Sequence, residues 1–214
     1  LIAGEDPETQ RKMRTPEIRD NLLTFIVAGH ETTALTLGWA LYLCAFAPDI
    51  QQAAAQQARD VLGKRAATAA DIEQLPLVRQ IIDEALRLYP PAGLISRTAQ
   101  KVDTLCGREV LPGDTVMVPI YVLHRNQLLW ENPDAFDPAR FKDGVPVDRY
   151  AYLPFGDGPR ICIGAGFAVQ EAVIILATLL ARFTFRAVPG RTPKPVMIIT
   201  LRPEGGVWLT AEPV

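Results

Sequence analysis

FGDGPRICIG, residues 155–164, is the most informative stretch of the sequence, and it contains Cys162 near its end. A helical pattern follows from about Gly164 to Phe183, so the cysteine lies just before the N-terminus of a predicted helix. Free backbone N–H groups and the helix dipole stabilise a thiolate at such a position. We therefore predict that Cys162 presents its sulfur for chemistry at the start of the final helix.

The neighbours of the cysteine support this interpretation. Gly156, Gly158 and Gly164 allow positive φ and let the backbone pass close to a flat group. Arg160 places a positive charge two residues from the sulfur, where it can bind a carboxylate. Phe155 can cover the sulfur and exclude water. A lone cysteine is more often a small buried hydrophobe, but five specified positions within ten residues favour a functional site.

These positions resemble the haem-binding signature of the cytochrome P450 family, F-x-x-G-x-R-x-C-x-G. The matching residues are Phe155, Gly158, Arg160, Cys162 and Gly164. The resemblance implies haem b, an iron protoporphyrin, as cofactor, with the thiolate of Cys162 as the proximal ligand of the iron. It also places the glycines, the phenylalanine and the arginine of this stretch around the haem.

A glutamate and an arginine form a second motif on the helix predicted to follow Pro76. Glu84 and Arg87 are three residues apart and so share one helix face. An isolated pair of this kind usually lies on the surface and contributes little to stability. The resemblance implies instead a buried network in which Arg140, from the stretch FDPARF at 136–141, is the third member. We interpret this network as a scaffold that holds the cysteine loop on the core.

A long helical pattern runs from Thr15, the predicted N-cap, to about Ala47. Its middle, AGHETT at residues 28–33, is a poor helix former and resembles the family's A-G-x-D/E-T-T motif on the distal, oxygen-side helix. By itself the string also fits a glycine-containing packing groove between helices, and that alternative stays open for the motif alone.

The resemblance gives this motif a role in haem and oxygen binding. Ala28 and Gly29 would let haem and O2 lie against the helix. Thr32 can bond back to a helix carbonyl and open the helix locally, which would hold water near the iron. Glu31 could relay protons from solvent, so Glu31 and Thr32 are the predicted catalytic residues. His30 is not assigned to iron, because a histidine there is more often a polar surface residue.

Secondary sites follow the same resemblance. Arg97 corresponds to the arginine that binds a haem propionate, and Leu94 and Ile95 would face the substrate. His124 could also contact a propionate, although a structural role in its loop is equally compatible with the sequence.

The alternation of helical and strand patterns predicts a mainly α fold with small β-sheets, of the α+β class. Strands are predicted within residues 94–119 and near 183–187, 196–200 and 207–210, and a short helix over 120–126. The resemblance implies the C-terminal portion of the P450 fold, with its long distal helix, E-x-x-R helix, cysteine loop and final helix.

Residues 1–214 are expected to form the C-terminal part of a single haem-binding domain. The chain begins at Leu1 and covers only about half of the family's usual length, so we expect the N-terminal half, with most of the substrate site, to be absent. We also expect the isolated fragment to be inactive.

Composition excludes several classes of protein. A formal net charge of −2 without a long basic run argues against a nucleic-acid partner. The 3 cysteines include no C-x-x-C spacing, which argues against a disulfide framework or a zinc site and suits a reducing compartment. The longest apolar run, 172–181, is too short for a membrane segment. We expect a cytoplasmic protein of the soluble bacterial type.

The leading functional hypothesis is a monooxygenase that inserts one atom of O2 into a small apolar organic substrate. Its electrons would come from a ferredoxin- or flavodoxin-type partner, which Arg149, Arg160 and Lys142 could dock. One alternative is a haem-thiolate isomerase or dehydratase, which needs no proton relay, and another is a non-catalytic haem sensor or binding module. A Cys–His hydrolase using Cys162 and His124 is disfavoured, because no residue to orient the histidine is evident.

Overall fold

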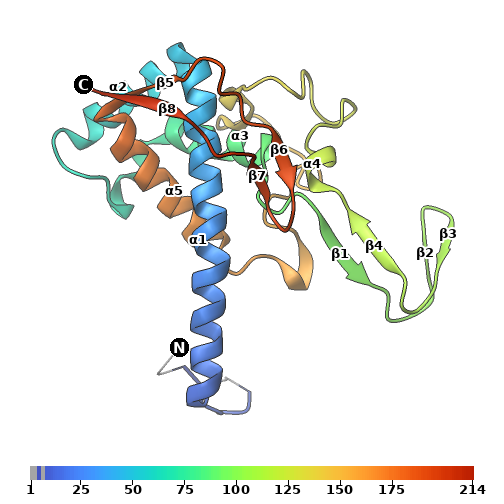
Figure 1. Cartoon of the computed structure of the whole chain (residues 1–214). Coiled ribbons are helices and arrows are strands. Elements are labelled where there is room, and N and C mark those ends of the chain that lie inside the picture. The colour runs from blue at the N-terminus through green and yellow to red at the C-terminus, as the bar shows by residue number, and fades with distance from the viewer. Residues whose placement is uncertain (1–3, 6–7) are drawn as a thin grey trace.

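The computed structural model describes residues 4–5 and 8–214, so the expectation that rests on Leu1 lies outside the described residues. The chain is mainly helical with small sheets, as predicted (Figure 1). The α-helices are α1 (Thr15–Phe46), α2 (Pro48–Leu62), α3 (Pro76–Leu88), α4 (Ile120–Leu123) and α5 (Ala165–Leu180). Short 3-10 helices are η1 (Ala69–Gln74), η2 (Pro138–Phe141) and η3 (Gly158–Arg160).

Helix α1 is continuous from Thr15 to Phe46. It begins one residue earlier than predicted, because Thr15 was expected to be the N-cap and is instead the first residue of the helix. The cap is Arg14, whose backbone N–H donates to a carboxylate oxygen of Glu17 at 2.8 Å. The chain bends by 116° before α2, because Pro48 cannot continue α1. Among the described residues, no single helix combines the length and hydropathy of a membrane span; only the bent pair α1–α2 does so jointly.

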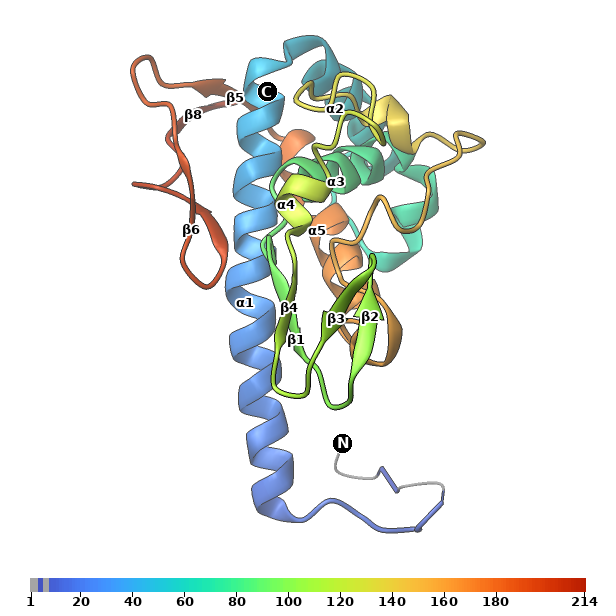
Figure 2. The ribbon, with the colours of Figure 1, turned by 90° about the vertical axis from the view of Figure 1, so that its right-hand side faces the viewer.

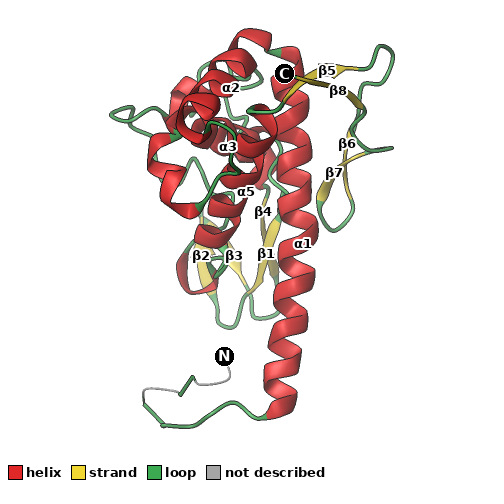
Figure 3. Ribbon diagram, turned by 90° about the vertical axis from the view of Figure 1, so that its left-hand side faces the viewer, coloured by secondary structure: helices red, strands yellow, loops and turns green. Residues whose placement is uncertain are grey.

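The core forms where the C-terminal half of α1 packs with α2, α3 and α5 (Figure 3). Helix α3 buries residues on most of its circumference, so it lies at the centre of this cluster. Helix α5 contributes an apolar face that includes Val173 and Leu176, both fully buried. The N-terminal half of α1 makes no comparable contacts: residues 19–31 are all exposed, and Figure 1 shows this half extending beyond the rest of the chain.

The strands form two-stranded antiparallel sheets, which pair β1 with β4, β2 with β3, β5 with β8 and β6 with β7. Their bounds are Ile95–Thr98 (β1), Asp103–Leu105 (β2), Arg108–Val110 (β3), Thr115–Val118 (β4), Phe183–Ala187 (β5), Pro195–Met197 (β6), Leu201–Pro203 (β7) and Leu209–Pro213 (β8). Figure 2 shows β5–β8 and β6–β7 on one side of α1 and α3, α5 and β1–β4 on the other. Helix α1 therefore separates two faces of the molecule.

Three predicted helix boundaries needed correction. The short helix after Pro119 ends at Leu123 rather than at residue 126. The final helix begins at Ala165, with Gly164 as its N-cap, and ends at Leu180. The residues after it turn and enter β5 at Phe183, because this strand pairs with β8 near the C-terminus.

Truncation of Leu176 tests where the core lies. Its side chain is fully buried on α5. We expect Leu176→Ala to lower the free energy of unfolding by about 2–5 kcal/mol, because the change removes buried apolar contacts and leaves a cavity. The same substitution at Leu128, which is 92% exposed, should change it by less than about 0.5 kcal/mol. Urea denaturation of both variants measures the difference, and equal effects would contradict this assignment of the core.

Candidate cofactor site

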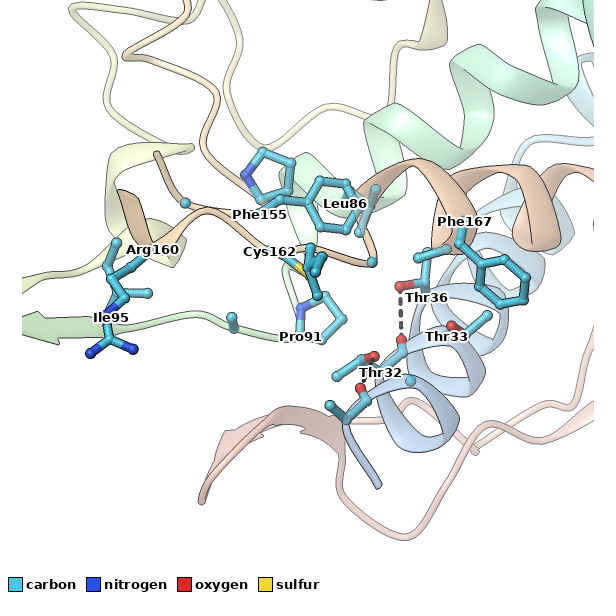
Figure 4. A pocket seen from close by; sticks show the side chains of 18 of the residues that line it. Thr32, Thr33, Thr36, Leu86, Pro91, Ile95, Phe155, Arg160, Cys162 and Phe167 are labelled. Carbon is cyan, nitrogen blue, oxygen red and sulfur yellow. Dashed lines mark hydrogen bonds between the residues drawn. The ribbon is translucent and has the colours of Figure 1, made fainter. Parts of the chain in front are cut away.

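The loop before α5 is closed by its own backbone and presents Cys162 outward. The N–H of Cys162 donates to the carbonyl of Phe155 at 3.0 Å. Gly156 and Gly158 have φ of 72° and 73°, the left-handed region that we predicted for them. The thiol of Cys162 is free and exposed, and Figure 4 shows its sulfur at the cavity with Phe155 and Pro91 labelled around it.

Gly164 differs from the prediction. Its φ is −87°, so positive φ is wrong for this glycine, which instead caps α5. A Cβ at this position would lie 3.8 Å from the sulfur of Cys162, which is an ordinary van der Waals contact. The glycine therefore leaves space beside the sulfur, although its backbone conformation does not require glycine.

A cavity of about 1130 Å³ lies between α1, the segment from Pro91 to Gln100, the cysteine loop and the first turns of α5. It brings together residues that are far apart in the sequence. The predicted site residues that line it are Ala28, Gly29, Thr32, Ile95, Arg97, Phe155, Gly156, Arg160, Cys162 and Gly164. The sulfur of Cys162 and the motif of α1 thus face one common space.

The wall formed by α1 is built on a four-residue repeat. The hydroxyl of Thr32 donates to the carbonyl of Ala28 at 2.7 Å, as predicted, and that of Thr36 donates to the carbonyl of Thr32 at 2.9 Å. The helix nevertheless remains continuous, so the predicted local opening is not observed. A Cβ on Gly29 would meet no atom within 4 Å, which leaves room for a flat group against the helix.

Two arginines border the cavity. Arg97 donates to the carbonyl of Ser96 at 2.8 Å, and Arg160 lines the cavity from the cysteine loop. Neither guanidinium has an ion-pair partner among the residues that the structure describes. The hydroxyl of Thr33 also lines the cavity and is buried without a hydrogen-bond partner within the described chain. A flat apolar group that carries carboxylates, such as haem, fits this arrangement of free cations around an apolar space.

Four other predicted residues lie away from this cavity. The carboxylate of Glu31 accepts a hydrogen bond from the hydroxyl of Thr200 at 3.0 Å, on the side of α1 that faces β6 and β7. Consecutive helix residues point about 100° apart, so Glu31 and Thr32 face different sides. Leu94 is 45% exposed and precedes the lining strand, and Gly158 is the first residue of η3.

His124 is the fourth, and it is fully buried. Its Nδ1 lies 3.1 Å from the carbonyl of Arg87, and its Nε2 accepts the N–H of Leu153 at 2.8 Å. Burial lowers the pKa of the imidazole to about 4, so the ring is neutral near pH 7. Because both ring nitrogens are bonded within the protein, the structural alternative fits His124 better than a propionate contact.

Glu84 and Arg87 form a fully buried ion pair. Arg87 donates to both oxygens of Glu84, at 2.6 and 2.8 Å. Its other N–H groups donate to the carbonyls of His124, Pro133 and Ala135, at 2.8, 2.6 and 3.0 Å. All five donors of the guanidinium are therefore used, as a buried arginine requires.

Arg140 joins this pair, as the family pattern implied. Its Nε lies 3.5 Å from Glu84, and its Nη2 donates to the carbonyl of Asn132 at 3.0 Å. Glu84 also accepts the N–H of Asp137 at 2.9 Å. These bonds hold the segment from His124 to Arg140 on α3. The predicted hold on the cysteine loop is indirect, because none of these bonds reaches residues 155–164.

Several lining residues were not predicted, including Thr36, Gln100, Ile163 and Phe167. Thr36 could have been found, since it lies one four-residue step beyond Thr32 on the same helix face. Ile163 and Phe167 are 86% and 70% exposed. No periodic signal marks them, because they flank a helix start.

Removal of Arg87 tests the buried pair. Arg87→Met should lower the free energy of unfolding by ~3–5 kcal/mol, because Glu84 would remain buried without its partner. Arg186→Met is the matched control, since its pair with Glu212 is 65% and 56% exposed and should contribute less than about 1 kcal/mol. Denaturant unfolding measures both changes. A similar small loss in both variants would show that the buried network is not required for stability.

Comparisons with known proteins show which family this chain is similar to. The sequence profile of the family described as Cytochrome P450 matches residues 1–210. Cyclooctatin synthase of Streptomyces melanosporofaciens is 41% identical over 207 residues, which are 95% of this chain and 45% of that protein. The putative cytochrome P450 132 of Mycobacterium bovis is 41% identical over 192 residues, 89% of this chain and 41% of its own. Mouse (Mus musculus) cytochrome P450 4A10 is 36% identical over 204 residues, 94% of this chain and 40% of its own. The chain thus spans less than half the length of these relatives.

Proposed function

The chain belongs to the cytochrome P450 family, a family of haem-thiolate monooxygenases, and from this premise we propose that it carries the haem and oxygen-activating part of such an enzyme. The observation that carries the proposal is the shared cavity, in which the sulfur of Cys162 faces the Ala28–Thr32 wall of α1. We propose haem b as the cofactor and Cys162 as its proximal ligand. When bound, the haem supplies the oxygen-activating chemistry of the family.

The residues around the cavity would bind and orient this group. Arg97 and Arg160 would bind its carboxylates, because both guanidiniums are free of acidic partners in the described chain. Phe155 would cover the sulfur of Cys162 and exclude water from it. Gly29 leaves the flat space that α1 must offer on the opposite side.

Thr32 and Glu31 would handle the protons that oxygen activation consumes. The hydroxyl of Thr32 donates its hydrogen bond to the carbonyl of Ala28. Its oxygen lone pairs are therefore available to accept a hydrogen bond from water in the cavity. The exposed carboxylate of Glu31 can exchange protons with solvent and pass them toward Thr32 through water. The pair supports oxygenation over an isomerase, a dehydratase or a passive haem-binding module, which need no such relay.

A Cys–His hydrolase is not supported by the site. The sulfur of Cys162 is exposed in the cavity, whereas His124 is fully buried with both ring nitrogens bonded to backbone groups. A general base must reach the proton that it removes, and this histidine cannot act on Cys162 in this arrangement.

For the whole protein we propose an apolar organic substrate, since Phe25, Ala92 and Ile95 line the cavity beside α1. A ferredoxin- or flavodoxin-type protein would supply electrons, as the family requires a redox partner. The basic docking surface is smaller than the sequence implied, because Arg149 is paired with Asp157 at 2.8 Å. The free, exposed thiols of Cys106 and Cys162 support a cytoplasmic location, where thiols stay reduced.

The decisive experiment is the optical spectrum of the haem-loaded, dithionite-reduced chain with carbon monoxide. We expect a strongly red-shifted Soret band, because a thiolate ligand donates electron density to the iron. Cys162→Ala should abolish the shift, and Cys106→Ala, which removes the other exposed thiol, should leave it unchanged. A shifted band that survives Cys162→Ala, or an unshifted band in the parent chain, would refute ligation by Cys162.

We also propose that residues 1–214 form the C-terminal part of one haem-binding domain and do not turn over substrate alone. Residues 19–31 of α1 are exposed, and they include the apolar side chains Leu22, Leu23 and Phe25, so no layer of the described residues covers the wall beside the cavity. An uncovered site admits water, which competes with substrate. Incubation of the haem-loaded chain with a reductase and an apolar substrate should yield no product, and product formation would contradict this.

A further inference from the structure

His124 occupies a position between α3 and the residues that lead into the cysteine loop. Its ring is fully buried and has two backbone partners of opposite kind. The carbonyl of Arg87 can only accept, so Nδ1 carries the hydrogen; the N–H of Leu153 can only donate, so Nε2 is the acceptor. The surroundings therefore select one neutral tautomer of His124.

On the α3 side, His124 and Arg87 are joined twice. The guanidinium of Arg87 donates to the carbonyl of His124 at 2.8 Å, while the imidazole of His124 faces the carbonyl of Arg87 at 3.1 Å. Because Arg87 is in turn paired with Glu84 and both side chains are fully buried, these bonds connect His124 to the buried ion pair.

On the other side, a short path of backbone bonds leads to the cysteine. The carbonyl of Leu153 accepts the N–H of Gly156 at 3.1 Å, and the carbonyl of Phe155 accepts the N–H of Cys162 at 3.0 Å. The hydrogen bond from the N–H of Leu153 to Nε2 of His124 thus connects these backbone bonds to the buried ion pair. Tyr152, the preceding residue, contacts α3 separately through its hydroxyl, which donates to the carbonyl of Asp83 at 3.0 Å.

We infer that His124 is a positioning residue for Cys162: its Nε2 holds the backbone of Leu153 and so transmits the rigidity of the Glu84–Arg87 pair to the cysteine loop. The inference rests on the proposed function, in which Cys162 is the iron ligand. It gives the histidine a role through hydrogen bonds to the backbone and not through contact with the cofactor.

Two substitutions separate the two bonds of the ring. In His124→Asn, the side-chain amide can take the place of Nδ1 and donate to Arg87, but it is too short to accept from Leu153. In His124→Gln, the amide oxygen can reach the place of Nε2 and restore that acceptor. Gln51→Leu is the matched control, because Gln51 is 4% exposed and bridges Cys44 and Phe185, remote from the cysteine loop.

The first measurement uses the haem-free chain with Cys106→Ser, so that Cys162 is the one exposed thiol among the residues described. Amide hydrogen exchange is followed at Leu153, Gly156 and Cys162, together with the rate at which iodoacetamide modifies the thiol. We expect His124→Asn to raise the exchange at these amides by about tenfold or more, because the Leu153 amide loses its acceptor and the bonds of the Gly156 and Cys162 amides depend on the segment that Leu153 anchors. The rate at which iodoacetamide modifies Cys162 should also change in His124→Asn. This rate should return to the parent value in His124→Gln and should stay at that value in Gln51→Leu.

The parent chain provides a check that survives if a variant fails to fold. The Leu153 amide should exchange as slowly as the amides of the core helices, and more slowly than the amides of Asp143 and Gly144, two exposed residues. Rapid exchange at Leu153 would overturn the inference, and so would unchanged exchange in His124→Asn.

The carbon monoxide spectrum of the haem-loaded variants separates this inference from the proposed function. A red-shifted band that weakens in His124→Asn and returns in His124→Gln supports both. If the parent lacks the shifted band while the exchange at Leu153 still responds, ligation by Cys162 fails and the positioning by His124 stands. If the parent has the band and His124→Asn alters neither band nor exchange, His124 does not position the loop.

Discussion

The structure depends on one buried ion pair. Glu84 and Arg87 are both fully buried, and a buried charge is tolerated only when each of its polar atoms finds a partner. Arg87 meets this demand with its five donors, three of which reach carbonyls of the chain between His124 and Ala135. A long segment with little regular secondary structure is therefore held against α3, and the chain can cross from β4 to the cysteine loop in a defined course.

The cysteine loop gains its geometry from that course. The segment held by Arg87 and Arg140 is covalently continuous with the loop, and His124 adds a direct bond to Leu153. The loop then closes on itself between Phe155 and Cys162, with the left-handed glycines at 156 and 158 making the turns. The buried Glu84–Arg87 pair thus restrains the backbone of the loop through His124 and Leu153, and this backbone positions the sulfur of Cys162. The thiol itself is exposed at the cavity.

Helix α1 divides the polar chemistry of the site between two faces. Thr32 lies on the cavity face and Glu31 on the face toward β6 and β7, where it meets Thr200. A short motif therefore contributes one residue to the cavity and another to its surroundings, and in the proposed relay protons would have to travel between them around the helix through water. The cavity face repeats at intervals of four residues from Ala28 to Thr36, which keeps small and hydroxylated side chains against the space left by Gly29.

The sequence by itself determined the family, the order of the helices and the residues of the three motifs, because these depend on local signals: prolines and caps at helix ends, apolar periodicity, and fixed spacing around Cys162. Of the 26 residues that line the cavity, 10 were predicted in the same way. Only the tertiary structure decided that His124 bonds to Arg87 and Leu153, that Glu31 faces Thr200, and that Gly164 needs no positive φ. It also decided the pairing of β5 with β8. These features rest on backbone groups and side chains from segments far apart in the chain, and hydrogen bonds between such segments leave no periodic trace in the sequence.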